Sequence, residues 1–473
     1  MPSHTLEEIL HPKSIAVVGA SGGGRGGQFV QPLLELGYKG KIYPVNPKYP
    51  EVLGMKTYPT LRDIPGPVDF VISVVPAREV LKMMEDAAQK GVKGIHLFTA
   101  RFSETGRSQA ALLEQEILRL AKSMGIRLIG PNCMGVYYPA EGISFQDEFP
   151  KKSGPVGLAS QSGNVAGEIV HNAGQRGVYF SKAISYGNAI DLNESDYLEY
   201  FAQDSETKTI LMYIEGVKDG RRFFDVLRRT TPVKPVIIMK GGKGQAGARA
   251  TASHTASLAG STQVWQAMVA QAGAVSVETP DELIDLAASF CFLPRIMGKR
   301  VGVAGGAGGA SVIAADECEK AGLEVVPLPP EFREEMKNRG ISIWDWLSNP
   351  ADLSIRENDD FSVGTVLEMM AKNPHFDLLI AIMGHMHRRF MGADLTIEQY
   401  VNEQYCLDRC RIKPFLAVVP IANLGANEWD SWEWKMNCEL RTKLIEERIP
   451  FYTGIPEAAS AVRKMIDYYQ RYV

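Results

Sequence analysis

Short hydrophobic runs alternate with longer amphipathic stretches along most of the chain. The runs are hydrophobic at nearly every position, whereas the stretches between them repeat hydrophobic residues at helical spacing. A strand that is hydrophobic throughout is covered on both faces, which is typical of parallel sheets with helices on either side. The pattern therefore predicts an α/β protein that is built from doubly wound sheets.

Two breaks in this periodicity divide the chain into three blocks. In the first block, helices are expected at Val80–Ala88 and Ala110–Met124. The strands expected there are Ile15–Val18, Ile42–Val45, Phe70–Val75, Ile95–Phe98 and Arg127–Ile129. Residues 137–153 then lose the periodicity and contain Pro139 and Pro150, which indicates a linker.

The second and third blocks repeat the scheme on either side of a break near Pro294–Gly298. A helix is expected from Gly163, and the last helix is expected at Pro456–Tyr469. The remaining expected strands are Val156–Ala159, Ile210–Ile214, Val236–Met239, Ala274–Val277, Val301–Val303, Glu324–Val326, Leu378–Met383 and Phe415–Val419. Because a single core stops growing at roughly 250–300 residues, we expect separate domains at 1–136, 154–293 and 298–473.

Composition and charge exclude several functional classes. A net charge of -4 with 22% charged residues does not favour nucleic acid or an anionic membrane as a partner. The sequence starts without a basic stretch and apolar run, and no apolar run reaches the roughly 20 residues of a membrane span. Cys406 and Cys410 share a helical spacing but lack neighbouring ligands, so a helix face is expected rather than a metal site. We expect a reduced, cytoplasmic protein without a metal.

A glycine-rich segment, residues 19–27, follows the first expected strand and precedes a helix. Glycines there let the backbone approach a phosphate, although a glycine-rich turn without a ligand is the alternative. Ser21 stands where the dinucleotide fingerprint requires its second glycine. The second strand ends at Val45-Asn46-Pro47-Lys48, with a cation where NAD enzymes place a carboxylate. A phosphorylated ribose, as in coenzyme A or NADP, is therefore favoured over NAD.

A long segment of small residues, 241–260, separates the strand that ends at Lys240 from the next helix. It contains His254 together with the cations Lys243 and Arg249. Loops of this length in compact domains are usually functional or disordered. A solvated surface histidine is the simplest interpretation of His254. The alternative is a nucleophilic imidazole on an arm that visits two sites.

Two further features could receive such an imidazole. Ser162 follows a strand and opens a helix, so it can cap that helix while the free amides of Gly163 and Asn164 bind an anion. Glu215 ends the strand Ile210–Ile214, and strand ends of this kind hold ligands in α/β sheets. Its carboxylate could fix the tautomer of an imidazole, although a solvated loop end explains Glu215 equally well.

The sequence carries four short motifs in a characteristic order. They are Val18–Ser21 with its glycine loop, Gly130–Gly135, Ser160–Gly163 and Ser253–Thr255. Each motif alone is weak, but the ordered set resembles the NDP-forming acyl-CoA synthetase and succinyl-CoA synthetase superfamily. The likeness extends to the α subunit of ADP-forming acetyl-CoA synthetases. It implies a Rossmann-like CoA-binding domain followed by two flavodoxin-like domains.

The resemblance also implies a reaction and the residues that carry it. Acyl-CoA and inorganic phosphate exchange to acyl phosphate and CoA, His254 takes the phosphoryl group, and a nucleoside diphosphate receives it. Glu215 would support His254, and Ser162, Gly163 and Asn164 would hold the phosphate. Coenzyme A would lie along Gly19, Ser21, Gly22, Gly24, Arg25, Asn46, Pro47, Lys48, Val75, Pro76 and Ala77, with its thiol near Asn132 and Cys133.

The family binds Mg-ADP or Mg-ATP in an ATP-grasp module, and all three blocks of this chain are otherwise assigned. The resemblance therefore implies an ATP-grasp β subunit as partner, in an α2β2 assembly, and a small carboxylic acid as substrate. The third block departs from the family pattern at 305–310 and also contains Trp344, Trp346, His385 and His387, which bears on the choice of acid. An NADP-dependent oxidoreductase and a non-catalytic CoA-binding protein are the alternatives.

Overall fold

The described part of the computed structural model comprises residues 4–23, 27–247, 261–352, 354, 361–383, 396, 398, 401, 405, 407–420 and 431–472. Gly24, Arg25 and His254 lie outside these residues, as do Arg249 and the pair His385 and His387. The chain divides into two compact units, residues 1–283 and 284–473, and each is described by itself.

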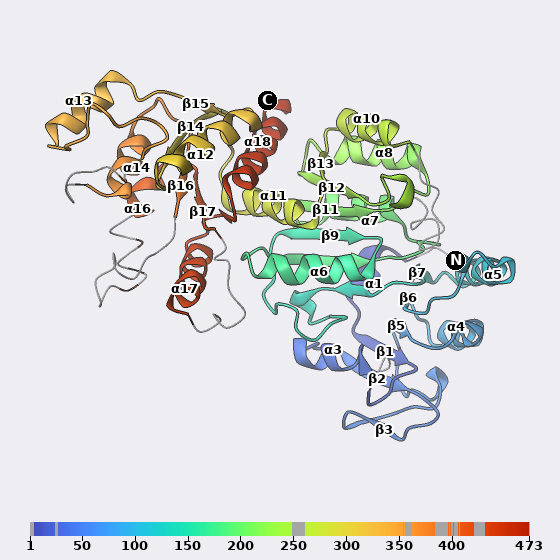
Figure 1. Ribbon diagram of the computed structural model, residues 1–473. Coiled ribbons are helices and arrows are strands. Elements are labelled where there is room, and N and C mark those ends of the chain that lie inside the picture. Colours follow the sequence, from blue (N-terminus) through green and yellow to red (C-terminus); the bar gives the residue numbers. More distant parts are fainter. Residues whose placement is uncertain are drawn as a thin grey trace. The chain divides into compact units, whose positions relative to one another are not determined.

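The first sheet of unit 1 is parallel throughout and runs in the order β2-β1-β5-β6-β7 (Figure 1). Its strands are β1 Ser14–Val18, β2 Lys41–Val45, β5 Phe70–Ser73, β6 Gly94–Leu97 and β7 Arg127–Ile129. The helices of this block are α1 Leu6–Leu10, α3 Gln31–Leu36, α4 Val80–Gln89 and α5 Ser108–Met124. Figure 1 shows α4 and α5 on one side of the sheet and α3 on the other. The strands are buried on both faces, as their continuous hydrophobicity predicts.

The second sheet of unit 1 runs in the order β13-β12-β11-β9-β10-β8, and β8 is its single antiparallel strand among the described residues. Its strands are β8 Gly135–Tyr137, β9 Val156–Ser160, β10 Phe180–Ser185, β11 Thr209–Ile214, β12 Val236–Lys240 and β13 Val275–Val277. Its helices are α6 Gly163–Gly174, α7 Glu194–Gln203, α8 Gly220–Thr230 and α10 Thr262–Ala272, and the next helix, α11 Pro280–Phe292, begins in unit 1 and ends in unit 2. The helix predicted from Gly163 is thus confirmed.

Two strands of this sheet have no counterpart among the predicted ones. Strand β8 has three residues, which is too short for a period to show, and it lies directly before the predicted linker. Strand β10 is interrupted in sequence by Lys182, although the side chain of this lysine is buried. Because a cation interrupts the hydrophobic residues of this strand, the hydrophobicity pattern did not predict it.

Unit 2 holds a third parallel sheet in the order β15-β14-β16-β17-β18. Its strands are β14 Arg300–Ala304, β15 Glu324–Val325, β16 Leu378–Ile382, β17 Phe415–Val418 and β18 Phe451–Tyr452. Its helices are α12 Gly308–Ala321, α13 Pro330–Asn338, α14 Val363–Lys372, α16 Leu407–Cys410, α17 Trp432–Glu446 and α18 Ile455–Arg471. The two-residue strand β18 was not among the expected strands.

The three large sheets share one strand order, and a small antiparallel sheet pairs β3 Glu51–Val52 with β4 Met55–Lys56. When the parallel strands of each block are numbered along the chain, each large sheet reads 2-1-3-4-5, with β8 as an additional edge strand of the second. The order reverses between strands 1 and 3, and ligands of such sheets bind at the carboxyl ends of the strands beside that reversal. The predicted α/β class with doubly wound domains is confirmed, and each block offers one such edge.

The first and second blocks meet along a hydrogen-bonded seam inside unit 1. The backbone N–H of Ile190 donates to the carbonyl of Gly130 at 3.2 Å, and that of Leu192 donates to Leu128 at 3.3 Å. Arg127 Nε donates to Asp191 Oδ2 at 2.8 Å in the same stretch. The segment after β10 therefore lies beside β7, which fixes the first sheet against the second.

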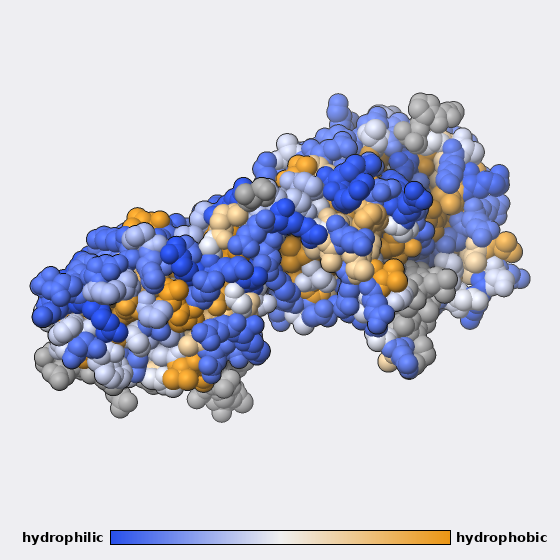
Figure 2. Space-filling model, turned by 90° about the horizontal axis from the view of Figure 1, so that it is seen from above, coloured by the Kyte–Doolittle hydropathy of each residue, from blue (hydrophilic) through white to orange (hydrophobic). Residues whose placement is uncertain are grey.

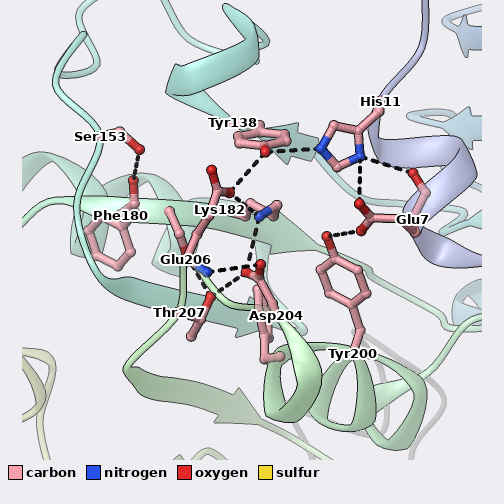
Figure 3. A network of polar contacts seen from close by, with 12 residues as sticks. Glu7, His11, Tyr138, Ser153, Phe180, Lys182, Tyr200, Asp204, Glu206 and Thr207 are labelled. Carbon is pink, nitrogen blue, oxygen red and sulfur yellow. Dashed lines mark hydrogen bonds and ion pairs between the residues drawn. The ribbon is translucent and has the colours of Figure 1, made fainter.

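A polar network extends this seam, with Lys182 at its centre (Figure 3). The side chain of Lys182 is 1% exposed, and its Nζ lies 3.0 Å from Asp204 Oδ2 and 4.3 Å from the ring centroid of Tyr138. Tyr138 Oη donates to Glu206 at 2.9 Å, and His11 Nε2 lies 3.1 Å from the same hydroxyl. Burial alone would raise the pKa of Asp204, but hydrogen bonds from Thr207 and Lys182 outweigh it and hold that pKa below its usual value.

The surface carries hydrophobic residues in small groups. On the face drawn in Figure 2, hydrophilic residues surround separate hydrophobic patches. Within the described residues, no helix combines the length and the hydropathy that crossing a membrane requires. The described His, Cys, Asp and Glu side chains also form no group of three that could hold a metal ion.

Candidate active site

A cavity of about 730 Å³ opens where the carboxyl ends of the first sheet meet the start of α6. It lies within unit 1, between elements that the seam fixes together. The lining consists of Val74, Val75, Pro76, Ala77, Arg78, Phe98, Thr99, Ala100, Arg101, Asn132, Cys133, Met134, Ser162, Gly163 and Asn164. The structure thus brings together three predicted segments, 75–77, 132–133 and 162–164, that belong to different blocks of the sequence.

The glycine loop after β1 lies against the start of the 74–78 wall. Gly19 has φ +93°, and a Cβ at this position would lie 2.9 Å from Val74 Cγ2, so glycine is required there. Its N–H donates to the carbonyl of Val45 at 2.8 Å. The hydroxyl of Ser21 donates to the carbonyl of Gly23 at 2.6 Å, and Gly22 has open space around it. The described loop residues, 19–23 and 27, border the cavity at the strand reversal and are not part of its lining.

The turn after β2 braces this loop. Asn46 Nδ2 donates to the carbonyl of Ala20 at 2.7 Å, and Asn46 Oδ1 accepts the N–H of Lys48 at 3.0 Å. Pro47 and Lys48 are exposed beside it. The predicted residues 46–48 therefore lie next to the glycine loop but outside the cavity lining.

The wall at Asn132 and Cys133 is held by a buried histidine. Asn132 has φ +60°, and its N–H donates to the carbonyl of Thr99 at 3.0 Å. His96 Nε2 lies 3.0 Å from the carbonyl of Cys133, so it carries the proton of this hydrogen bond. Burial lowers the pKa of His96 to about 4, although the bond to Cys133 opposes the shift. Burial also raises the pKa of the Cys133 thiol, so this cysteine is a packed thiol rather than a nucleophile.

The opposite wall is the start of α6. Ser162 is the N-cap, and its hydroxyl accepts the N–H of Val165 at 3.4 Å. The next amides of a helix start have no intrahelical partner and carry positive potential, which suits an anion. A Cβ at Gly163 would lie 2.4 Å from Met134 Cγ, so only glycine lets this helix start approach the neighbouring wall.

Glu215 lies behind this wall, at the carboxyl end of β11. It is 5% exposed, and Tyr213 Oη donates to its Oε1 at 3.2 Å. Gln161 Oε1 accepts the N–H groups of Glu215 and Gly216 at 2.7 and 2.9 Å. Sequence reasoning gave Gln161 no role; its place inside the motif Ser160–Gly163 was the available signal. Gln161 couples the helix start to Glu215 directly.

The ends of the predicted histidine loop are anchored beside Glu215. Thr262 Oγ1 donates to the carbonyl of Lys243 at 3.1 Å, and Lys240 Nζ donates to the carbonyl of Glu215 at 2.8 Å. Lys243 itself is paired with Glu278 at 2.6 Å. Residues of both loop ends line a small pocket of about 160 Å³ next to Gly216. The segment that contains His254 thus leaves and returns at the same edge of the second sheet.

The corresponding edge of the third sheet is built differently. The N-cap of α12 is Ala307, whose side chain forms no cap hydrogen bond. A Cβ at Gly308 would lie 3.0 Å from Asp352 Oδ2, so a carboxylate of the protein lies at this helix start. Asp352 Oδ1 in turn accepts hydrogen bonds from the N–H and hydroxyl of Ser354 at 2.9 and 2.6 Å.

Comparisons with known protein families agree with this geometry. Residues 13–139 match the model of a CoA binding domain, and residues 153–290 match that of the succinyl-CoA ligase like flavodoxin domain. The chain is 39% identical over 389 residues to the acetate–CoA ligase [ADP-forming] II subunit alpha of Pyrococcus furiosus, covering 80% of this chain and 82% of the relative. The chain belongs to the NDP-forming acyl-CoA synthetase family.

Two more members of this acyl-CoA synthetase family show its range. The acetate–CoA ligase [ADP-forming] of Methanocaldococcus jannaschii is 39% identical over 74% of this chain, which spans about half, 49%, of that relative. Among solved structures, an acetyl-coenzyme A synthetase 1 of Ca. Korarchaeum cryptofilum, in complex with phosphate and ADP, has a TM-score of 0.82 at 30% identity. That match covers 99% of this chain and 98% of the other.

Proposed function

We propose that the chain is the CoA-binding and phosphoryl-carrying part of an ADP-forming acid–CoA ligase. It interconverts acyl-CoA, ADP and phosphate with a carboxylic acid, CoA and ATP. The observation that carries this proposal is the cavity, because it unites the predicted CoA wall at 75–77 and 132–133 with the predicted phosphate cradle at 162–164. One cavity can thus hold a thioester and a phosphate side by side.

The reaction begins with exchange at the acyl carbon. A phosphate oxygen attacks the thioester carbonyl, the C–O bond forms, the C–S bond breaks, and the CoA thiolate leaves and takes up a proton. The amides of Gly163 and Asn164, with the Ser162 cap, hold the phosphate and its developing charge. The products of this step are acyl phosphate and free CoA.

In the second step, His254 receives the phosphoryl group. A ring nitrogen forms the N–P bond, and the P–O bond to the carboxylate breaks, which releases the acid. Glu215 supports this step from its buried position by accepting the other ring N–H. Since the loop is anchored at Lys243 and Thr262, ten residues lie between Lys243 and His254, and seven lie between His254 and Thr262. Such a span reaches on the order of 30 Å when extended, which allows transfer to a second site.

The second site belongs to a partner in this proposal. The Pyrococcus furiosus relative is named as a subunit alpha, and the Methanocaldococcus jannaschii relative is about twice as long as the part that this chain matches. We therefore assign Mg-ADP binding to an ATP-grasp β subunit, in an α2β2 assembly. The names of the relatives also support small carboxylic acids such as acetate as the substrate class.

The test is phosphoryl labelling of the reconstituted complex. With the partner and γ-labelled ATP, the wild type should carry an acid-labile, base-stable phosphate. His254→Asn should lose the label and the overall turnover but keep its affinity for CoA, because the CoA wall belongs to the first block. Label that persists undiminished in His254→Asn would place the phosphohistidine elsewhere and defeat the assignment. Binding of NADPH instead of CoA would defeat the CoA role.

A further inference from the structure

We infer that Arg101 binds a phosphate oxygen of the ligand in the cavity. The residue lies outside every motif of the sequence, and it forms part of the cavity lining. The inference rests on the proposed function, because that function supplies the phosphate-bearing ligands. It adds a cation to a cavity in which the predicted phosphate cradle, residues 162–164, offers backbone amides and a serine cap.

The backbone of Arg101 is held in a conformation that arginine rarely adopts. Its φ is +83°, in the left-handed region that favours glycine. The Glu104 carboxylate maintains this turn by accepting the N–H groups of Arg101 and Phe102, the latter at 3.0 Å. The Phe102 side chain is fully buried in the hydrophobic core, which anchors the turn. A strained residue persists only where its surroundings impose it, and such residues cluster at ligand sites.

The turn is also tied to the seam between the blocks. Asn188 Nδ2 donates to Glu104 Oε2 at 2.7 Å, and the carbonyl of Thr99 accepts the N–H of Asn132. The position of Arg101 is therefore set by the same contacts that set the distance between the CoA wall and the phosphate cradle. The backbone from which the Arg101 side chain extends is therefore fixed relative to both walls.

The charge of Arg101 is available to a ligand. Its side chain is exposed, and no ion pair with it occurs among the residues that the structure describes. Arg78, the other arginine of the lining, lies 3.4 Å from the carboxylate of Glu79 instead. Arginine recognises phosphate through its planar fork of N–H donors. Phosphate is present in two forms here, as the group bound at α6 and as the phosphates of CoA itself.

The strained backbone provides a clean test. Arg101→Gly removes the guanidinium and suits φ +83°, and Arg101→Asn is a second variant that tolerates this conformation. Arg107→Gly is the matched control, since Arg107 is exposed in the same loop, has φ -85° and lies outside the cavity lining. We expect both Arg101 variants to unfold at a temperature no lower than that of the wild type.

Titration calorimetry of the full chain with CoA and with inorganic phosphate distinguishes the two forms. Both Arg101 variants should bind one of these ligands roughly tenfold more weakly, as expected for a lost charge-assisted hydrogen bond, while Arg107→Gly binds both normally. A loss for phosphate alone assigns Arg101 to the cradle, and a loss for CoA alone assigns it to the cofactor. Unchanged affinities in both Arg101 variants would overturn the inference. If the wild type binds neither ligand, the proposed function is wrong, and the inference about Arg101 is then wrong as well.

Discussion

The helix starts of α6 and α12 occupy equivalent places in two sheets of identical strand order, yet they present opposite chemistry. At α6, Ser162 caps the helix and the following amides face a cavity. At α12, Ala307 provides no side-chain cap, and Asp352 lies at the first helical residue. A helix start attracts anions in both places, but at α12 the protein supplies the anion itself.

The difference shows that the strand order determines at which edge of a sheet a ligand can bind, and that the side chains at this edge determine whether a ligand binds there. Both edges follow the first strand of their block, and both lie at the strand reversal. At α6, a second wall, carrying Asn132 to Met134, faces the helix start across a cavity. The candidate site thus depends on the meeting of two blocks, whereas the carboxylate at α12 comes from the same block as the helix.

The largest expected effect concerns the wall opposite α6, at Asn132 and Cys133. The buried His96 supports this wall through its hydrogen bond to the carbonyl of Cys133. The pKa of His96 is about 4 in the folded protein and about 6.5 in the unfolded chain, which therefore binds the proton first as the pH falls. Stability should decline by about 3 kcal/mol between pH 6.5 and pH 4 on account of this residue. Urea unfolding at several pH values should show this slope reduced in His96→Gln and unchanged in His171→Gln, an exposed control. Equal slopes in all three proteins would show that His96 does not carry the effect.

Gly163 tests whether α6 must approach its neighbour closely. In Gly163→Ala, the new Cβ meets Met134 Cγ, so the helix start has to move by about an ångström, and turnover should fall about 100-fold. Gly309→Ala is the counterpart at α12, where no atom lies within 4 Å of the added Cβ. That variant should keep full turnover and gain about 0.5 kcal/mol of stability. Similar activity losses in both variants would remove the distinction between the two helix starts.

Ser162→Asp would give α6 the carboxylate that α12 has. Aspartate caps helices as well as serine does, so the unfolding free energy should stay within about 0.5 kcal/mol of the wild type. The added charge should weaken phosphate binding by at least about tenfold, measured by calorimetry, because it competes for the same amides. Ser162→Asn, a neutral cap, should lose clearly less affinity for phosphate than the aspartate variant. Should the aspartate variant bind phosphate as well as the asparagine variant does, the anion site lies elsewhere.

Asp352→Asn should have the smallest effect. The substitution removes the charge at α12 while it keeps an oxygen that can accept from Ser354. We expect a loss of about 1 kcal/mol in unfolding free energy and no change in turnover. A marked fall in turnover would mean that the third block's edge takes part in the reaction.

Much of the fold could be predicted from hydrophobic periodicity, because strands that are buried on both faces are unmistakable in sequence. The helix start at Gly163 and the strand Arg127–Ile129 were predicted at their observed positions. Strands β10 and β8 were not, since a buried Lys182 broke the first pattern and three residues are too few for the second. Short runs and buried charges carry no periodic signal.

The candidate site was predictable where it depends on local chain geometry and obscure where it depends on contacts between blocks. The segment 162–164 was predicted from its place between a strand and a helix, whereas 75–77 and 132–133 were predicted from the family resemblance, and the cavity unites all three. Gln161 and Arg101 were missed because their roles rest on a neighbouring strand and on a backbone angle. Neither the contact of Gln161 with the neighbouring strand nor the backbone angle of Arg101 can be inferred from the amino-acid sequence by pattern alone.

The seam around Lys182 has a consequence for how the chain is made. Near the amino terminus, His11 contacts the hydroxyl of Tyr138, and Glu7 accepts a hydrogen bond from the hydroxyl of Tyr200. Lys182 forms ion pairs with Asp204 and Glu206. On a ribosome, which delivers the chain from its amino end, the first sheet is complete at β7, about seventy residues before Tyr200, Asp204 and Glu206 are added. The nascent first block must therefore wait, with part of its future contact surface uncovered, until the first part of the second block has been made. The residues that are synthesised first therefore form their native contacts with the second block late.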